Sequence, residues 1–520
     1  MGGTKTLVAS LSTAGVVNVG SGSTLSLGAN TLTLSGAGSP LVVTGALSPG
    51  TSTVAFTSAS SQIIPAANFY NLTSSSFARE LQSSGTIFIE NTFSPGTGAY
   101  TTTGSTVNFN KNANQTIPVI TGDWFNLSTS IGGTKSISGT FNVNGTLTIG
   151  AGTTLNANSA VVTFPTGPTP FVATGNFTHG TSTLLFTSNA TQTIPANVIY
   201  YSLTLNGTGA KNISAASGVD FRVNRNFDIS CPVTWTNVNS IYIFKEFNGN
   251  MPLNPGAIPV TVGDDWYNTA VGYTMTGNML YTAEDGNIVN IGGINYNNLT
   301  INPIEGNTIT TVIANPITIS GTLTVYDKVT LTTSNRVTLL SSASSFANIA
   351  PLTGTAIISG NVKVQTWFTG GAGKRGTRMV APTIVETSLA AGNKFFQQLK
   401  ANMVITGPGG VTNGFDAGNN TQPYATTLTK YNEAAPLATS QFTPISNLNN
   451  GTVPGMLPGD AFFLFFRGDR TGYNNGYPSS SAVLWSDYAP ESFASMVNGP
   501  VAQGTINVPI SNSDNPMDTN

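Results

Sequence analysis

A short phrase of alternating apolar and polar residues recurs along the chain. Each clear copy is a strand-like run that ends in Phe, with a Gln six residues later. The Phe positions are Phe56, Phe109 and Phe186, and the Gln positions are Gln62, Gln115 and Gln192. A weaker fourth copy places Tyr281 where the others have Phe. Repetition of short β-type phrases is typical of folds in which similar coils stack along one axis.

An aromatic residue followed by N-L-T, or a close variant, comes after the Gln of each copy. The Asn of this phrase is Asn71, Asn126 and Asn298 in three of the copies. Asn side chains at one position of stacked coils can hydrogen-bond to each other as a ladder. We therefore predict that these Asn residues have a structural role.

The strand-like phrases have a period of two residues. In Thr146–Ile149 (T-L-T-I) the Leu and Ile share one face and the Thr residues share the other. One strand of about five residues cannot hide its apolar face alone, whereas a coil stacked on top of it does so. We therefore predict an all-β protein in which residues 1–355 form a parallel β-solenoid of irregular repeats. A tandem array of β-sandwich modules is the alternative.

The repeat phrases give way to a different sequence pattern near residue 355. Residues 356–520 are predicted to form a smaller β-rich globular domain. The densest basic cluster of the chain lies at Gly373–Arg378, and an apolar run at Ala461–Arg467 predicts a buried strand. One short amphipathic helix is predicted at Asn393–Ala401, with Asn393 as its N-cap.

The composition excludes several classes of protein. Only 8% of residues are charged, the net charge is −2 and no run of Lys or Arg occurs, so a nucleic-acid partner is not expected. No stretch approaches the roughly 18 continuous apolar residues of a membrane span. Cys231 is the only cysteine, so no disulfide can form within the chain.

Residues suited to catalysis are scarce. His179 is the only histidine, and it lies in a Gly-flanked polar turn that predicts a solvated residue rather than a member of a catalytic triad. One His and one Cys also exclude the usual zinc sites. We therefore predict no catalytic residues and no enzymatic activity.

Calcium is the one cofactor that the sequence leaves open, because hard cations bind carboxylate and carbonyl oxygens. Asp416 and Asp469 are the best candidates for this weak prediction, since the EF-hand spacing is missing. Arg467–Asp469 spells R-G-D, for which a turn at a strand end with an Arg–Asp pair is the expected structure.

Aromatic residues near the turns have two interpretations. They either stack on sugar rings or pack in the core, and core packing is the expected role for each one. The residues concerned are Tyr70, Trp124, Tyr200 and Tyr201.

The repeat phrases, taken in the order in which they occur along the chain, resemble the large secreted surface proteins of Bacteroidota that are exported by the type IX secretion system. The stretches that carry the resemblance beyond the repeats are Val362–Phe368, Thr377–Pro382, Ile405–Asp416 and Phe465–Arg470. The resemblance implies an extracellular location at the cell surface and a role in adhesion or in a surface layer. Such proteins end in a sorting domain. None is seen here, and the G-G-T-K-T-L start matches an interior phrase at Gly132–Ile137, so we expect the chain to be a fragment.

The favoured hypothesis is a non-enzymatic extracellular stalk or adhesin segment, with glycans or neighbouring cell-surface proteins as partners. One alternative is a surface solenoid that binds or degrades carbohydrate. Another is the subunit of a homopolymeric extracellular filament, because open solenoid ends can self-associate strand to strand.

Overall fold

The computed structural model describes residues 2–270, 273–283, 289–304, 308–421, 425–432, 435, 441–449, 459–474 and 478–506. The protein is nearly all-β, with 46% strand and 4% helix, and it forms a parallel β-solenoid of about 16 turns. This confirms the predicted fold class. The chain divides into two compact units, Met1–Gly263 with Tyr267–Ala270 and Asp264–Trp266 with Val271–Asn520.

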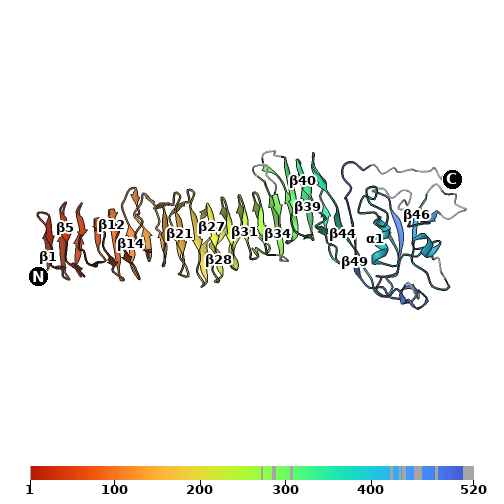
Figure 1. Ribbon diagram of the computed structural model, residues 1–520, viewed down its shortest axis with the longest axis horizontal. Helices are drawn as coiled ribbons and strands as arrows, with labels where there is room; N and C mark the ends of the chain where they lie inside the picture. The colour runs from red at the N-terminus through yellow and green to blue at the C-terminus, as the bar shows by residue number, and fades with distance from the viewer. Residues whose placement is uncertain are drawn as a thin grey trace, which may run out of the picture. The chain divides into compact units, whose positions relative to one another are not determined.

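The longest sheet of the first unit runs through successive coils, which Figure 1 shows side by side from β5 to β14. All neighbours in it are parallel. Its strands are, in order, β2 (Leu11–Thr13), β5 (Thr31–Leu34), β8 (Thr53–Phe56), β10 (Asn68–Ser74), β12 (Thr86–Ser94), β14 (Thr106–Phe109), β16 (Asn126–Thr129), β19 (Leu147–Ile149) and β22 (Phe171–Ala173). Because β8 and β14 belong to one continuous sheet, the alternative of separate sandwich modules is wrong.

Two further parallel ladders run through the later coils of this unit. One contains β18 (Thr140–Asn142), β21 (Val161–Phe164), β24 (Thr183–Phe186), β27 (Ser202–Leu205), β29 (Phe227–Ile229) and β31 (Phe247–Gly249). The other contains β25 (Gln192–Pro195), β28 (Lys211–Val223), β30 (Val233–Ile243) and β32 (Val260–Val262).

The repeat Phe residues form part of an apolar column inside the coils. Phe56, Phe109 and Phe186 are each 0% exposed. Each lies in register with an apolar residue of the preceding coil, and the rings of Phe186 and Phe164 stack with centroids 4.7 Å apart. Tyr281, in the second unit, is also fully buried and is in register with Ile301. Stacking coils therefore hides the apolar face that one strand leaves open.

Parallel coils also form the first part of the second unit. One ladder contains β34 (Thr274–Tyr281), β36 (Asn295–Ile301), β38 (Ile317–Ile319), β41 (Val337–Leu339) and β44 (Val362–Phe368), and another contains β35 (Val289–Ile291), β37 (Ile309–Ile313), β40 (Val329–Thr332) and β43 (Ile357–Ser359). The predicted boundary at residue 355 precedes β43 and β44, which still pair in parallel with the preceding coils. Antiparallel pairing begins where β49 (Phe493–Gly499) adds to β44.

The remaining part of this unit is an antiparallel sheet with one described α-helix, α1 (Phe395–Asn402). The sheet has the order β45 (Gly376–Val380), β48 (Phe462–Phe466), β46 (Leu428–Tyr431) and β47 (Phe442–Pro444). Phe396 of the helix packs edge-on against Phe462 of the sheet, with ring centroids 5.0 Å apart. A small second core therefore lies between the helix and the sheet.

The predicted helix is present, but its predicted N-cap is wrong. Lys394, not Asn393, precedes the first turn, and its N–H donates to Oε1 of Gln397 at 3.0 Å. The buried carboxylate of Glu386 accepts the N–H of Phe395. A carboxylate from outside the helix thus takes over the capping role, which local sequence spacing does not reveal.

Buried tyrosines make the stability of the fold sensitive to alkaline pH. Burial raises the pKa of Tyr100 to about 12, against about 10 for an unfolded tyrosine. The folded chain then keeps a proton that the unfolded chain loses, so this stabilisation is complete below pH 10 and disappears as the pH rises from about 10 to about 12. We expect Tyr100 to contribute a loss of about 1 kcal/mol at about pH 11.

Thermal unfolding as a function of pH, with Tyr100→Phe for comparison, measures this contribution. The variant should show a shallower alkaline decline than the parent chain. Identical declines would show that Tyr100 does not titrate as described.

Candidate functional site

The three repeat glutamines lie inside the coils and bind the preceding coil. Nε2 of Gln62 donates to the carbonyls of Leu34 and Gly36, at 2.9 and 2.7 Å, and its Oε1 accepts the N–H of Ser58 at 3.1 Å. The other two repeat this pair of donations, Gln115 to Ile89 and Asn91 and Gln192 to Phe164 and Thr166. The six-residue spacing is thereby explained, because the Gln reaches back to the carbonyl of the residue paired with the repeat Phe.

A basic residue of the next coil lies in register with each of these glutamines. Arg79 pairs with Gln62, Lys135 with Gln115 and Lys211 with Gln192. All three basic side chains are at most 1% exposed. Burying a charged group is costly unless it is hydrogen-bonded, so their partners decide whether the arrangement is stable.

Backbone carbonyls surround the buried lysines. Nζ of Lys135 donates to the carbonyls of Lys111, Ala113 and Gly132, the last at 2.6 Å. Nζ of Lys211 donates to the carbonyls of Ser188 and Gly209, at 2.8 and 2.9 Å. Burial lowers the pKa of both lysines, and the charge of Lys111 adds to the effect at Lys135.

Arg79 uses its guanidinium in the same way. Its Nη2 donates to the carbonyls of Phe56 and Ser58, at 2.9 and 3.2 Å. A basic residue in a Gly-rich phrase ordinarily predicts a solvated turn, so the repeat pattern did not reveal these buried basic residues. The available signal was that Lys135 and Lys211 follow their glutamines by 20 and 19 residues, about one coil, in a chain with few charges.

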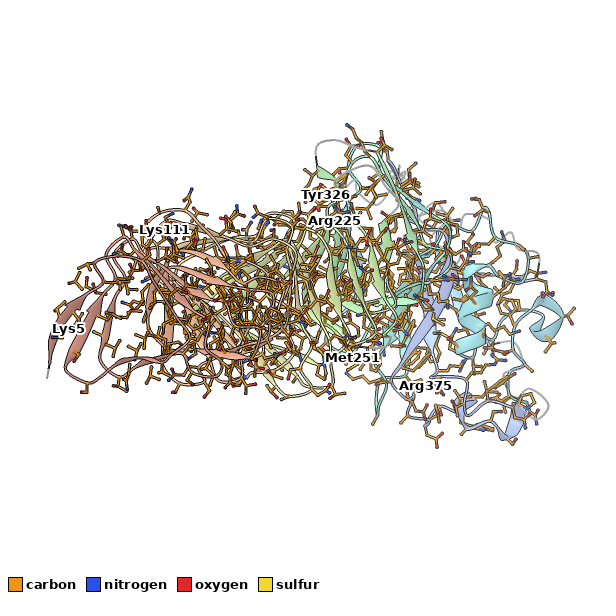
Figure 2. All side chains as sticks on the ribbon, turned by 60° about the vertical axis from the view of Figure 1, so that its left-hand side comes forward. Lys5, Lys111, Arg225, Met251, Tyr326 and Arg375 are labelled. Atoms are coloured by element: carbon orange, nitrogen blue, oxygen red, sulfur yellow. The ribbon has the colours of Figure 1, made fainter. Side chains whose placement is uncertain are left out.

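Lys5 occupies the matching position of the first coil but is exposed (Figure 2). Lys5 precedes Lys135 by 130 residues. Gln62 and Gln192, which are equivalent positions of the repeat, have the same separation. Lys5 is in register with Leu25, as Lys135 is with Leu155. Among the described residues, β1 (Gly3–Thr6) pairs only with β4 (Ser23–Ser26), and none of the carbonyl contacts seen at Lys135 is found at Lys5 in that part of the chain.

The repeat asparagines bridge the coils on either side of their own. Nδ2 of Asn126 donates to Oγ1 of Thr106 at 3.3 Å, and its Oδ1 accepts the N–H of Thr146 at 3.0 Å. Asn298 does the same with Asn278 and Thr322, and Asn71 with Thr53 and Asn91. Each is therefore a local bridge of three coils, and the three do not form one continuous ladder.

Replacing Asn126 with Ala should lower the stability of its coil by about 1 kcal/mol, because two half-buried hydrogen bonds are lost. Hydrogen exchange of the amides in β14, β16 and β19 measures the effect locally. Asn197 is exposed, so Asn197→Ala is the matched control and should leave exchange unchanged. Equal protection in both variants would contradict the bridging role.

The two candidate calcium ligands already have protein partners. Asp416 is 1% exposed, and its two carboxylate oxygens accept from Arg470 at 2.8 and 2.6 Å. Asp469 accepts from the N–H and the hydroxyl of Thr471, at 3.0 and 2.8 Å. No group of three or more metal-ligating side chains occurs in the described ranges. Calcium binding stays a prediction, and at Asp416 it would have to displace a guanidinium.

The expected pair of Arg467 and Asp469 is not formed, so this prediction is wrong. The guanidinium of Arg467 lies over the ring of Phe465, 5.0 Å from its centroid. Both oxygens of Asp469 are directed to Thr471 instead.

His179 belongs to a half-buried surface cluster. Its Nδ1 is 2.8 Å from the carbonyl of Gly180, and its Nε2 is 3.0 Å from Nδ2 of Asn224. Its ring stacks on Tyr201, whose hydroxyl accepts from Arg225 (labelled in Figure 2). Both ring nitrogens are thus occupied by neutral groups, an arrangement that differs from a catalytic triad.

The aromatic residues near the turns divide into two groups. Trp124 and Tyr200 are 1% and 0% exposed and belong to the core, as expected. Tyr70 and Tyr201 are half-buried. Only the latter two have surface to offer to a ligand.

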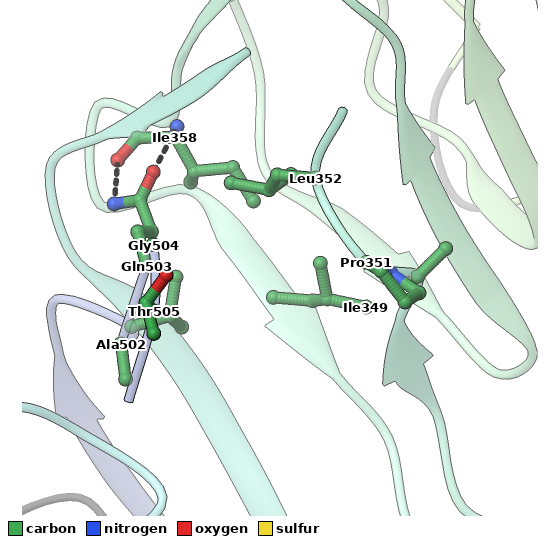
Figure 3. A pocket seen from close by; sticks show the side chains of 10 residues that line it. Ile349, Pro351, Leu352, Ile358, Ala502, Gln503, Gly504 and Thr505 are labelled. Atoms are coloured by element: carbon green, nitrogen blue, oxygen red, sulfur yellow. Dashed lines mark hydrogen bonds between the residues drawn. The ribbon is translucent and has the colours of Figure 1, made fainter. Parts of the chain in front are cut away.

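One pocket, of about 470 Å³, lies beside the edge of β43 (Figure 3). Its walls are formed by residues 349–352 and 501–505 together with Ile358. The side-chain amide of Gln503 accepts the N–H of Ile358 at 2.7 Å and donates to its carbonyl at 2.8 Å. Gln503 thereby occupies hydrogen-bonding positions that another strand would use, and the pocket presents no titratable side chain.

The fold defines the chain as a parallel β-solenoid protein with an appended antiparallel part. None of the known protein families, curated proteins and solved structures with which the chain was compared matches it. In the portion of the chain that the structure describes, no helix has the length and apolar character needed to cross a bilayer.

Proposed function

We propose that the chain is a non-enzymatic structural segment of an extracellular surface protein. The coils act as a stalk, and the appended antiparallel part contributes an adhesive surface. The resemblance of the repeat phrases to secreted surface proteins of the type IX secretion system supports the location. Glycans or neighbouring surface proteins are the partners that this role implies.

The observation that carries this proposal is the use of the recurring polar residues. In the described coils, the recurring polar residues hydrogen-bond from one coil to the next. They are Gln62, Gln115 and Gln192, the basic residues stacked on them and the repeat asparagines. Residues that recur in a repeat are thus used for stacking rather than for a reactive site. A protein whose repeats add coils gains length and outer surface.

A filament of identical copies joined strand to strand is the alternative hypothesis. Such joining needs a free strand edge at each end of a copy. In the last coil two strands have protein partners on their outer edges: β49 covers β44, and the side chain of Gln503 binds the N–H and carbonyl of Ile358 in β43. Negative-stain electron microscopy of the purified chain should therefore show discrete particles, and fibres would support the filament alternative.

A reducing-sugar assay on a panel of polysaccharides tests the absence of catalysis. We expect no release of reducing ends above the buffer blank. Turnover that disappears in the double variant Asp264→Asn, Asp265→Asn, which removes two carboxylates that are adjacent in the sequence of the described coils, would overturn the non-enzymatic proposal.

A further inference from the structure

Two arginines line a second pocket of about 470 Å³ in the antiparallel part of the second unit. They are Arg375, which is labelled in Figure 2, and Arg467. Trp485 and Phe465 also line the pocket, and polar groups of Asn419, Thr421, Thr426 and Ser486 complete its wall.

Strand register forces the two arginines together. β45 and β48 are antiparallel, with Gly376 in register with Phe466. Arg375 directly precedes β45 and Arg467 directly follows β48, so the two residues meet at the same end of the strand pair. Like charges opposite each other on neighbouring strands are destabilising.

The ring of Phe465 lies beneath both guanidinium groups. The centroid of this ring is 5.7 Å from the guanidinium carbon of Arg375 and 5.0 Å from that of Arg467. Cation–π contacts of this kind hold a guanidinium in place without neutralising it.

Arg467 is buried and lacks an anionic partner. It is 8% exposed, its Nε has no hydrogen-bond partner, and no carboxylate within the described ranges forms an ion pair with it. Burial and the charge of Arg375 lower its pKa to about 10. A buried cation without a counter-charge is costly, and an anion in the pocket would remove that cost.

Arg375 is more fully engaged than Arg467. Its Nη1 donates to the carbonyl of Val483 at 2.8 Å, and the nearby carboxylate of Asp487 partly offsets its charge. Asp487 is exposed at the surface, whereas Arg467 is buried. The positive charge that remains unbalanced is therefore concentrated at Arg467.

We propose that this pocket binds an acidic saccharide, with the carboxylate or sulfate of one sugar unit held by Arg467 and Arg375. Guanidinium groups match the planar, multi-oxygen geometry of such anions. Trp485 is 41% exposed and offers an indole surface on which a sugar ring can stack. The hydroxyl and amide groups of the wall suit sugar hydroxyls, which a simple inorganic anion lacks.

Isothermal titration calorimetry with the full chain tests the proposal. The probes are a uronic acid disaccharide, a sulfated disaccharide, the matched neutral disaccharide and sodium sulfate. We expect at least one acidic disaccharide to bind at least tenfold more tightly than both the neutral disaccharide and sulfate. Arg467→Met should weaken that binding at least tenfold.

Arg225→Met is the matched control, because Arg225 also lies over an aromatic ring, at 6.0 Å from Tyr201, but lies outside the pocket. It should bind as the parent chain does. If Arg467→Met fails to fold, Arg375→Met provides the same comparison. Binding that is unaffected in the folded pocket variant, or no binding of either acidic disaccharide, would overturn the proposal.

Sulfate that binds as tightly as the acidic disaccharides would overturn the saccharide assignment and leave a simple anion site. All of these outcomes are independent of the stalk role proposed for the coils. If the pocket binds no saccharide, the coil-to-coil contacts still support the stalk role. If the coils prove to be catalytic, the binding proposed for the pocket is unaffected.

Discussion

Replacing Lys135 with Met should destabilise the coils around it by about 2 kcal/mol. The variant keeps the length of the side chain but removes the ammonium group that binds three backbone carbonyls. Those part-buried carbonyls would then lose their donor, and this cost exceeds the relief of no longer burying a charge.

Lys5 provides the matched control for this prediction. It belongs to the same G-T-K phrase but is exposed, so Lys5→Met should change stability little. Hydrogen exchange of amides in β15 (Gln115–Thr116), β17 (Thr134–Ser136) and β20 (Thr154–Asn156) resolves the effect in a repeat fold, in which unfolding need not be two-state. Equal exchange in the two variants would contradict a stabilising role of the buried ammonium.

Replacing Asp416 with Asn should have a larger effect, about 3 kcal/mol, confined to the antiparallel part of the second unit. The carboxylate is buried and accepts two short bonds from Arg470 and a third from the N–H of Ile405 at 2.9 Å. An amide cannot accept on both of its polar atoms. The variant leaves the guanidinium without its counter-charge.

The exposed pair of Lys430 and Asp460 is the comparison for Asp416. Its atoms are 3.1 Å apart, and the side chains are 36% and 23% exposed. Asp460→Asn should therefore cost less than about 1 kcal/mol. Denaturant unfolding followed by near-ultraviolet circular dichroism measures both variants. Similar losses in the two would show that burial of Asp416 does not strengthen its ion pair.

A calcium titration of the parent chain separates the two roles considered for Asp416. A carboxylate held by Arg470 should leave the unfolding midpoint unchanged when calcium is added or chelated. A rise in the midpoint with calcium that is lost in Asp416→Asn would support the calcium site instead, since a ligand that binds the native state raises its stability.

The solenoid could be predicted because the relevant signal is local and repeated. Alternation within phrases such as Thr146–Ile149 identifies the strands, and the recurrence of Phe56, Phe109 and Phe186 shows that successive strands need each other for burial. The short helix near residue 395 was also predictable from its amphipathic pattern. Its cap was not, because Glu386 comes from outside the helix.

The polar contacts inside the coils could be predicted only in part. The repeat spacing identified Gln62 and its equivalents as structural, but their carbonyl partners lie 24 to 28 residues away in the preceding coil. The burial of Lys135 was hidden because a Lys in a Gly-rich phrase ordinarily predicts a solvated turn. Lys5, in the same phrase, is exposed in β1, which among the described residues pairs only with β4.

The sequence by itself determined the periodicity, the strands and the residues that line the interior, since alternation and recurrence are written along the chain. Only the tertiary structure decided which charges are buried and which remain unbalanced. The meeting of Arg375 with Arg467, and of Asp416 with Arg470, depends on strand register and chain reversal. Such pairings join residues separated by 92 and 54 positions, and electrostatic energy depends on their distance in space rather than along the chain.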